Sequence, residues 1–399
     1  MRRRLRRRGS EADASSPASR ISRRLPHPPR SSPSPPSSPR LVAVHAGRNR
    51  PVTPPCHPTP SRQEAHTVLI PTDATTQPPG LDLNAALRTD VERGLTSYPK
   101  ALPAKWLYDA TGSALFESIT RLPEYYPTRT ERALLASCST QIAAAAKART
   151  LIELGSGSSD KTRLLLDSLL ARQSLHTYVP VDVSASALRQ AHAALSADYA
   201  GLAITPLVSD FAAGLTLPPS RDPRLVVFLG GTLGNFLPWE RAAFLDTLRS
   251  QISPGDTLLL GVDLVKDPDI IIAAYDDAAG ITAQFSLNVL RRLNRELDAD
   301  FDLDAFEHVA FWDTEHEWIE MRLRSRRPQD VTIASLGLSV RFEAGEHLRT
   351  EISAKFRPDD LAHQLSAAGL ELSRWWTDPD QFYGLALATL SEDDLARAQ

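Results

Sequence analysis

The sequence predicts an α/β protein with a mostly parallel β-sheet at its centre. From residue 150 onward, apolar runs of strand length alternate with segments whose apolar residues recur at helical spacing. This alternation is typical of βαβ units, which pair successive strands in parallel. The first apolar run, Thr150–Leu154, leads into a turn that contains Gly155 and Gly157. Glycines there let the backbone approach a bound nucleotide closely, so the turn indicates a ligand site.

The elements are predicted in chain order from these apolar patterns. A helix is expected at 129–147, ahead of the first strand. The sheet region is predicted as strand 150–154, helix 160–170, strand 177–183, helix 185–195, strands 203–208 and 225–229, helix 239–251 and strand 257–262. The C-terminal part is predicted as a long helix at 268–293 with a weak point at Gly280, strands 319–325, 331–336 and 348–356, helix 358–368, and strands 370–376 and 382–388.

Residues 1–82 are predicted to be a disordered extension rich in Arg, Pro and Ser. Residues 1–80 hold 16 of the 31 prolines, and residues 1–65 carry 14 arginines against three acidic residues. Such a segment cannot bury enough apolar surface to offset the entropy lost on ordering. A transit peptide and a nucleic-acid-binding arm remain alternatives for this composition. We expect a plain extension and no nucleic-acid partner.

Composition excludes several classes of protein. No apolar run reaches the roughly 18 residues of a membrane-spanning helix, so no membrane partner is expected. The two cysteines, Cys56 and Cys138, are too few for a disulfide framework, which favours a cytoplasmic protein. No Cys and His spacing matches a zinc site, so no metal is expected. The segment 303–308, Leu-Asp-Ala-Phe-Glu-His, is predicted to pack as a helix rather than to bind a metal.

The glycine turn differs from the dinucleotide-binding fingerprint. Asp160 stands where the pattern G-x-G-x-x-G has its third glycine. A Glu-x-Gly-x-Gly turn, here from Glu153 to Gly157, resembles instead the motif of S-adenosylmethionine-dependent methyltransferases. The sequence therefore predicts S-adenosylmethionine as the cofactor.

Acidic residues end the second and third predicted strands. A carboxylate at Asp182 can accept hydrogen bonds from ribose hydroxyls. Asp210 ends the next strand, where methyltransferases often contact the adenine amine while an apolar neighbour packs on the ring. Either aspartate alone is explained equally well as a helix or loop cap. The glycine turn, Asp182 and Asp210 follow three predicted strands, and all three suit the same nucleoside. This favours the interpretation that they bind a ligand.

Polar and aromatic residues around the sheet are candidates for substrate contacts. Asn235 ends the run Phe-Leu-Gly-Gly-Thr-Leu-Gly-Asn after the fourth strand and offers both a donor and acceptors. A turn-forming asparagine is the alternative. Tyr108 and Tyr125 lie in proline-flanked segments before the sheet, where aromatic residues are commonly core corners.

These residues belong to a series of motifs that occurs in order along the chain. The motifs are Lys105-Trp-Leu-Tyr-Asp, Leu122-Pro-Glu-Tyr-Tyr-Pro-Thr-Arg-Thr-Glu131, Glu153-Leu-Gly-Ser-Gly, Phe228-Leu-Gly-Gly-Thr-Leu-Gly-Asn, Leu264-Val-Lys-Asp, Ala274-Tyr-Asp-Asp-Ala-Ala-Gly280 and Glu351-Ile-Ser-Ala-Lys-Phe-Arg357. Over about residues 83–390 the chain resembles the histidine Nα-methyltransferases of ergothioneine biosynthesis, which form Nα,Nα,Nα-trimethylhistidine (hercynine).

The resemblance implies a Rossmann-like S-adenosylmethionine-dependent methyltransferase with a second, smaller α+β substrate-binding domain. The methyltransferase domain is expected at 130–264 and 356–399, and the substrate-binding domain at 83–129 and 265–355. The residues that fall where the family binds the cofactor are Tyr108, Gly155, Lys161, Asp182, Asp210 and Phe211. Those that fall where it binds L-histidine are Tyr125, Asn235, Tyr275, Met321, Glu351 and Ser353. A monomer is expected.

The reaction implied by the resemblance is an in-line attack of the α-amine on the sulfonium methyl group, so alignment and an unprotonated amine are what the protein must supply. Asn235 and Tyr275 are expected to hold the α-carboxylate, and Asn235 also to orient the amine, near which Tyr125 lies. These assignments make Tyr125 and Asn235 the catalytic candidates. Glu351 and Ser353 are expected to recognise the imidazole.

Two alternatives remain at this point. One is a methyltransferase of the same fold that acts on another amino acid or small amine, since histidine specificity depends largely on Glu351 and Ser353. The other is a non-catalytic protein that binds S-adenosylmethionine or, through its basic extension, nucleic acid.

Overall fold

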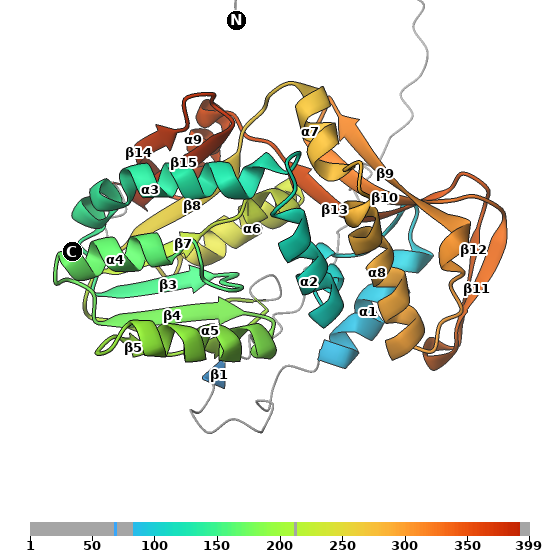
Figure 1. The fold of residues 1–399 in the computed structure, drawn as a ribbon, viewed down its shortest axis with the longest axis horizontal. Helices are drawn as coiled ribbons and strands as arrows, with labels where there is room; N and C mark the ends of the chain where they lie inside the picture. Colours follow the sequence, from blue (N-terminus) through green and yellow to red (C-terminus); the bar gives the residue numbers. More distant parts are fainter. Residues whose placement is uncertain (1–67, 70–82, 211–213, 392–399) are drawn as a thin grey trace, which may run out of the picture. The chain divides into compact units, whose positions relative to one another are not determined.

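The computed structural model describes residues 68–69, 83–210 and 214–391 of the 399-residue chain (Figure 1). Most of the extension predicted at 1–82 therefore lies outside the described residues. Within it, Val68–Leu69 form strand β1, which pairs antiparallel with strand β6, Leu207–Val208. At these two residues the structure departs from the predicted disorder, because the edge of the sheet offers hydrogen-bonding partners to their backbone.

A nine-stranded sheet contains the predicted parallel strands. Its other strands are β3 (Thr150–Leu154), β4 (Thr177–Asp182), β5 (Ala203–Ile204), β7 (Arg224–Phe228), β8 (Thr257–Asp263), β14 (Leu370–Thr377) and β15 (Tyr383–Leu390). The order is β1-β6-β4-β3-β7-β8-β15-β14, and β5 pairs with β4. The strands from β6 to β8 run parallel, whereas β1, β15 and β14 pair antiparallel with their neighbours. The predicted α/β class and mostly parallel sheet are confirmed.

Helices cover both faces of this sheet (Figure 1). One face is covered by α3 (Tyr126–Ala146), α4 (Arg163–Ala171) and α5 (Ala185–Asp198), and the other by α6 (Pro238–Arg249) and α9 (Pro358–Ala367). In β3, Leu151 belongs to the apolar cluster of the first face and Ile152 to that of the second. Because both faces are buried, the strands read as continuous apolar runs.

A second sheet of four strands is assembled from distant parts of the chain. Its order is β2 (Lys100–Ala101), β13 (His347–Ala354), β10 (Trp318–Ser325) and β9 (Phe306–Asp313). A separate hairpin consists of β11 (Gln329–Ile333) and β12 (Leu338–Phe342). An apolar cluster of its own joins these strands to α1 (Leu83–Thr96), η1 (Ala104–Leu107), α2 (Ala110–Ile119), α7 (Pro268–Tyr275) and α8 (Ile281–Glu296). This smaller α+β part agrees with the predicted fold class.

The prediction of one long helix at 268–293 is wrong, because the chain forms two helices, α7 and α8, with a break between them. Gly280 adopts a left-handed φ of +70° at the start of α8. The carboxylate of Asp277 accepts the N–H groups of Ile281 and Thr282 at 3.0 and 2.7 Å. These two bonds satisfy N–H groups that a new helix leaves without partners, so the break is stabilised locally.

The prediction of helical packing at 303–308 is also wrong. Leu303–Ala305 form one 3-10 turn, and β9 begins at Phe306. β9 pairs antiparallel with β10 over its whole length, with Phe306 beside Ser325. Pairing with a distant strand overrides the local pattern here. The strand predicted at 203–208 is split into β5 and β6, and β12 was not predicted at all.

Among the helices of the described residues, none combines the length and the apolar composition that a bilayer crossing requires.

Candidate active site

The glycine turn and the two predicted aspartates follow adjacent strands at one edge of the large sheet. β3 and β4 pair with Leu154 beside Val181, and β4 and β6 pair with Asp182 beside Val208. The turn after β3 therefore lies next to Asp182, and Asp210 follows the neighbouring strand. In an open α/β sheet this edge is where ligands bind.

Asp182 connects the turn to the helix that follows β4. Its Oδ2 accepts the N–H of Gly157 at 3.0 Å, and its Oδ1 accepts the N–H of Ser184 at 2.9 Å. Ser184, not Asp182, caps α5, since its hydroxyl oxygen accepts the N–H of Ala187 at 3.2 Å. Burial raises the pKa of Asp182, although the N–H donors oppose that shift. Asp182 thus remains a candidate for binding hydroxyl groups.

Lys161 is paired with a buried carboxylate that the sequence reasoning did not single out. Its Nζ forms an ion pair with Glu131, whose side chain is 1% exposed. Glu131 Oε1 also accepts the N–H of Gly230 at 2.7 Å and the hydroxyl of Tyr383 at 2.9 Å. The carboxylate therefore connects α3 to the turn between β3 and α4, to the loop after β7 and to the start of β15. Glu131 is the last residue of the 122–131 motif, and membership of that motif was the sequence signal that could have identified it as a site residue.

Asp210 is buried and forms an ion pair with Lys105 Nζ at 2.9 Å. The same Nζ lies 3.1 Å from Asp90. Burial lowers the pKa of Lys105, but the two carboxylates outweigh it and leave that pKa raised. Lys105, which opens the 105–109 motif, was not predicted as a site residue. Phe211 lies outside the described residues.

Glu351 and its neighbours form the centre of the predicted substrate group. Met321 lies directly opposite Glu351 in the pairing of β10 with β13, so both side chains are on one face. Asn235 Nδ2 donates to Glu351 Oε1 at 2.9 Å and to the Ile352 carbonyl at 2.6 Å. Glu351 Oε2 is buried and has no hydrogen-bond partner among the described residues. Burial raises the pKa of Glu351 to about 7, against the opposing effects of Asn235 and Lys355.

Ser353 and Tyr275 form a hydroxyl pair held by a buried lysine. Tyr275 Oη donates to Ser353 Oγ at 2.9 Å. Lys355 Nζ donates to Ser353 Oγ at 2.8 Å and to Tyr275 Oη at 3.0 Å. Lys355 was not predicted as a site residue, although Glu351, Ser353 and Lys355 follow one another at a spacing of two residues. Residues two apart share one face of a strand, and that spacing was the available signal.

Asp263, at the end of β8, is the counter-ion of two lysines. Its carboxylate lies 2.9 Å from Lys355 Nζ and 2.5 Å from Lys266 Nζ. The Tyr126 hydroxyl donates to the same carboxylate at 2.8 Å. Burial alone would raise the pKa of Asp263, but Lys355 and Lys266 leave it lowered. Burial also lowers the pKa of Lys266 to about 8.

Tyr125 is 7% exposed and packs edge-on against Tyr275, with ring centroids 6.0 Å apart. Burial raises the pKa values of both phenols well above the usual range. Both hydroxyl groups therefore keep their protons at neutral pH and act through hydrogen bonds.

Tyr108 is close enough to both the predicted substrate residues and the predicted cofactor residues to be affected by their charges. Burial raises the pKa of its phenol, and the charges of Glu351 and of Asp182 raise it further. One of these carboxylates belongs to the predicted substrate group and the other to the cofactor group. Its ring contacts Phe285 edge-on at a centroid distance of 5.3 Å.

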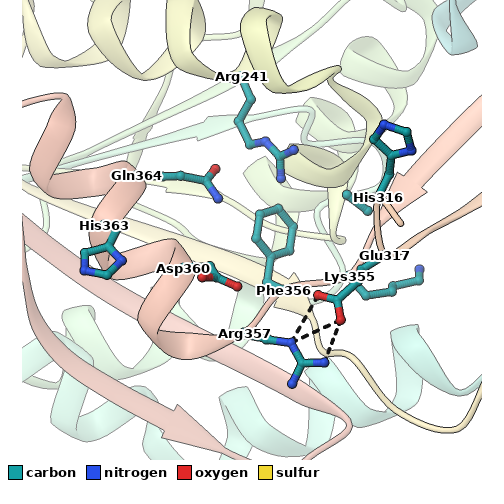
Figure 2. Close-up of a pocket in the computed structure, with 10 residues that line it drawn as sticks. Arg241, His316, Glu317, Lys355, Phe356, Arg357, Asp360, His363 and Gln364 are labelled. Carbon is teal, nitrogen blue, oxygen red and sulfur yellow. Dashed lines mark hydrogen bonds and ion pairs between the residues drawn. The ribbon is translucent and has the colours of Figure 1, made fainter. Parts of the chain in front are cut away.

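Two surface cavities border this chemistry only through Lys355 and Tyr126, one in each. One, of about 330 Å³, is lined by Arg241, Phe356 and Gln364 among others (Figure 2). The second, of about 400 Å³, is lined by residues that include Phe382. None of the twelve predicted site residues lines either cavity. In Figure 2 the Lys355 side chain extends away from Arg241 and Gln364, in keeping with its bonds to the hydroxyl pair. We therefore locate the candidate site from its buried polar groups.

In the described part of the chain, no group of three or more His, Cys, Asp or Glu side chains is arranged to hold a metal ion. His308, in the segment considered for metal binding, lies in β9, and its Nε2 is 2.8 Å from the Tyr275 carbonyl.

Comparisons with known proteins identify the family. Residues 87–390 match the model of the histidine-specific, S-adenosylmethionine-dependent methyltransferases. The chain is 56% identical over 303 residues to histidine N-alpha-methyltransferase of Mycolicibacterium smegmatis, covering 76% of this chain and 94% of that protein. The corresponding protein of Mycobacterium tuberculosis is 53% identical over the same coverage. Ergothioneine biosynthesis protein 1 of Neurospora crassa is 30% identical over 298 residues, 73% of this chain and 33% of that protein. The chain belongs to the family of histidine-specific, S-adenosylmethionine-dependent methyltransferases.

Proposed function

We propose that this protein transfers three methyl groups in succession from S-adenosylmethionine to the α-amino group of L-histidine. The product is Nα,Nα,Nα-trimethylhistidine (hercynine), an intermediate of ergothioneine biosynthesis. The family, two histidine N-alpha-methyltransferases at more than half identity and a relative named for ergothioneine biosynthesis support this proposal.

One observation carries the choice of histidine as substrate. Glu351 Oε2 is buried and has no donor among the described residues, and Ser353 follows two residues later on the same face of β13. An unpaired buried carboxylate oxygen is costly, so it indicates a ligand that brings an N–H group. The imidazole of histidine brings one, and Met321 supplies an apolar wall on the same face of the sheet.

Six residues are proposed to hold S-adenosylmethionine: Tyr108, Gly155, Lys161, Asp182, Asp210 and Phe211. The turn suits such a ligand, because Gly155 and Gly157 have φ values of +70° and +50°. A Cβ built on Gly157 would meet no atom within 4 Å, so there is room beside the backbone. The cofactor supplies a methyl group that the positive sulfonium already activates.

The substrate amine is proposed to lie between Asn235 and Tyr125. Both N–H bonds of the Asn235 amide are used by Glu351 and Ile352, so its Oδ1 is the atom that can accept an amine N–H. The Tyr125 phenol oxygen is proposed to accept an amine N–H, which orients the amine and leaves its lone pair available for the attack. For Asn235 also to hold the α-carboxylate, its Nδ2 must turn from Glu351 toward the substrate. The one proton of Tyr275 stays on Ser353 Oγ, so the α-carboxylate contact expected for Tyr275 is left to Asn235 in this proposal. Positioning of this kind can supply roughly 7–11 kcal/mol.

We also propose that residues 130–264 and 356–399 act as a methyltransferase domain, and residues 83–129 and 265–355 as a substrate-binding domain. The apolar clusters of the two sheets support this division, although Trp318, Ile352 and Ala354 of β10 and β13 pack in a cluster of the large sheet. A cytoplasmic monomer that binds neither nucleic acid nor membrane is the proposed working form, and sedimentation of the purified chain tests the monomer.

Mass spectrometry of the purified protein with L-histidine and S-adenosylmethionine tests the function. The expected product is histidine heavier by three methyl substitutions, with mono- and dimethylated forms as intermediates. L-Tryptophan and L-phenylalanine serve as matched substrates that carry the same amine. Preferential methylation of either, or cofactor binding without any methylated histidine, would overturn the proposal.

A further inference from the structure

The hydroxyl groups of Ser353 and Tyr275 carry one proton each, so together they can donate two hydrogen bonds. An ammonium group only donates, so neither hydroxyl proton can point at Lys355. Lys355 Nζ lies 2.8 Å from Ser353 Oγ and 3.0 Å from Tyr275 Oη. The Tyr275 proton is donated to Ser353 Oγ at 2.9 Å. Ser353 Oγ then accepts two hydrogen bonds, and its own proton must point toward a third group.

The described residues contribute no acceptor for that proton. Two residues earlier in the same strand, Glu351 Oε2 is a buried acceptor to which no described residue donates. Residues i and i+2 lie about 7 Å apart on one face of a strand. The Ser353 hydroxyl proton and Glu351 Oε2 therefore lie on one face of β13, and neither has a hydrogen-bond partner among the described residues. A neutral imidazole, with one N–H and one bare nitrogen, complements both.

We propose that Lys355 is a positioning residue that sets ring specificity by making Ser353 a hydrogen-bond donor. With Lys355 bonded to both hydroxyl oxygens, the site accepts a ring that offers an acceptor to Ser353 and an N–H to Glu351. It rejects rings that lack the bare nitrogen. This inference rests on the proposed function, because it concerns how the same site recognises histidine.

Lys266 provides a matched control for the electrostatic role of Lys355. Both ammonium groups are buried, and both form ion pairs with Asp263. Lys266 instead donates to Tyr126, at 2.8 Å, and makes no described bond to the hydroxyl pair. Lys355→Met and Lys266→Met each remove one positive partner of Asp263 and leave the other. Only the first removes the bonds to Ser353 and Tyr275.

The test compares kcat/KM for L-histidine with that for the two pyrrolylalanines in which one or the other ring nitrogen is replaced by CH. The wild type is expected to prefer histidine over the better pyrrole by at least about 100-fold, because the pyrrole leaves Ser353 without an acceptor. In Lys355→Met the Ser353 proton can turn inward, and this preference is expected to fall at least about tenfold. In Lys266→Met the preference for histidine over the better pyrrole is expected to stay within about twofold of wild type, since the bonds to Ser353 and Tyr275 are intact.

A double-mutant cycle with Ser353→Ala decides whether Lys355 acts through Ser353. In the Ser353→Ala background, Lys355→Met should leave the histidine-to-pyrrole ratio unchanged within about twofold. An equal loss in that background, or an equal loss in Lys266→Met, overturns the proposal. If Lys355→Met does not fold, Lys355→Gln replaces it, because its amide also offers an acceptor to the Ser353 proton. Wild-type turnover of histidine tests the proposed function separately, so trimethylation with an unchanged ratio refutes only the role of Lys355.

Discussion

Polar side chains are paired differently in two regions. We call them the cofactor edge, which is the proposed cofactor site around Asp182 and Asp210, and the substrate strand, which is β13 with the proposed substrate residues Glu351 and Ser353. At the cofactor edge, Asp182 accepts two backbone N–H groups, and Asp210 and Lys161 are in ion pairs. On the substrate strand, Glu351 Oε2 has no described partner although it is buried. The first region is therefore held in shape without a ligand, whereas the second retains an unmet hydrogen bond. We therefore propose that substrate selection depends on the buried acceptor of Glu351, which has no partner among the described residues.

The largest effect is expected from Glu351→Ala. Loss of the carboxylate should lower kcat/KM for histidine by roughly 10²–10⁴-fold, since a site built to hydrogen-bond a substrate discriminates on that scale. The loss should appear mainly in KM for histidine, measured with saturating cofactor. An equal rise in KM for S-adenosylmethionine would remove the distinction between the two regions.

Asp182→Ala probes the cofactor edge. We expect KM for S-adenosylmethionine to rise about 10–100-fold, because a hydroxyl-binding carboxylate and two backbone bonds are lost together. KM for histidine should change little. Calorimetric titration of the cofactor measures the effect directly, and Asp182→Asn, which keeps one acceptor oxygen, should lose less. Unaltered cofactor affinity in Asp182→Ala would contradict the ribose assignment.

The pH dependence should differ between the regions through Glu351, whose pKa is raised to about 7 by burial. The ionised carboxylate accepts the imidazole N–H, so KM for histidine should rise up to about tenfold per pH unit below 7. Glu351→Gln keeps only the part of this profile that comes from protonation of the substrate ring, near pH 6.5. A wild-type profile identical to that of Glu351→Gln would show that Glu351 does not titrate in this range.

The same ionisation has a stability consequence with a definite sign. Since the folded pKa is raised, burial of the charge costs nothing below the unfolded pKa of about 4.3 and its full amount above about pH 7. Denaturant unfolding should therefore find unliganded Glu351→Gln more stable than wild type by about 1–3 kcal/mol at pH 8, and nearly equal at pH 4.5. Equal stability at both pH values would mean that the buried carboxylate carries no such cost.

Gly234→Ala should weaken the contact between the loop of Asn235 and β13. A Cβ at Gly234 would lie 2.7 Å from the Ala354 carbonyl oxygen, which is closer than real Cβ atoms approach. We expect a loss of about 1–3 kcal/mol in the free energy of unfolding and a several-fold lower kcat for histidine. Gly345→Ala is a control, because its added Cβ meets no atom within 4 Å and only the backbone is strained. Similar kinetic losses in both variants would contradict this role for Gly234.

The smallest effect is expected from truncation of the extension. Removal of residues 1–60 keeps β1, whereas removal of residues 1–80 deletes it. Histidine turnover should stay within about twofold of wild type in both, because the predicted site residues all lie beyond residue 100. Loss of turnover in the shorter truncation would favour a functional extension.

The sequence predicted the cofactor edge more completely than the substrate strand. Strand ends and a glycine turn are local signals, and the rules of parallel sheets bring consecutive strand ends together. Glu131 and Lys105, which hold Lys161 and Asp210, lie in quoted motifs but are not marked by any local pattern. Their partners are 30 and 105 residues away in the chain. Only the folded chain identifies such pairs.

On the substrate strand, Glu351 and Ser353 were named from the resemblance, while Lys355 was not. Its role depends on contacts with two residues from other elements, Tyr275 at the end of α7 and Asp263 at the end of β8. The segment at 303–308 was likewise misread, because its strand exists only through pairing with β10.

By itself the sequence determined the alternation of strands and helices, the glycine turn and the order of motifs that mark the family, since these depend on near neighbours in the chain. The tertiary structure decided which buried charges face one another and which acceptor remains unpaired. The physical reason is that desolvation and hydrogen bonding act through space, between groups that three separate segments bring together.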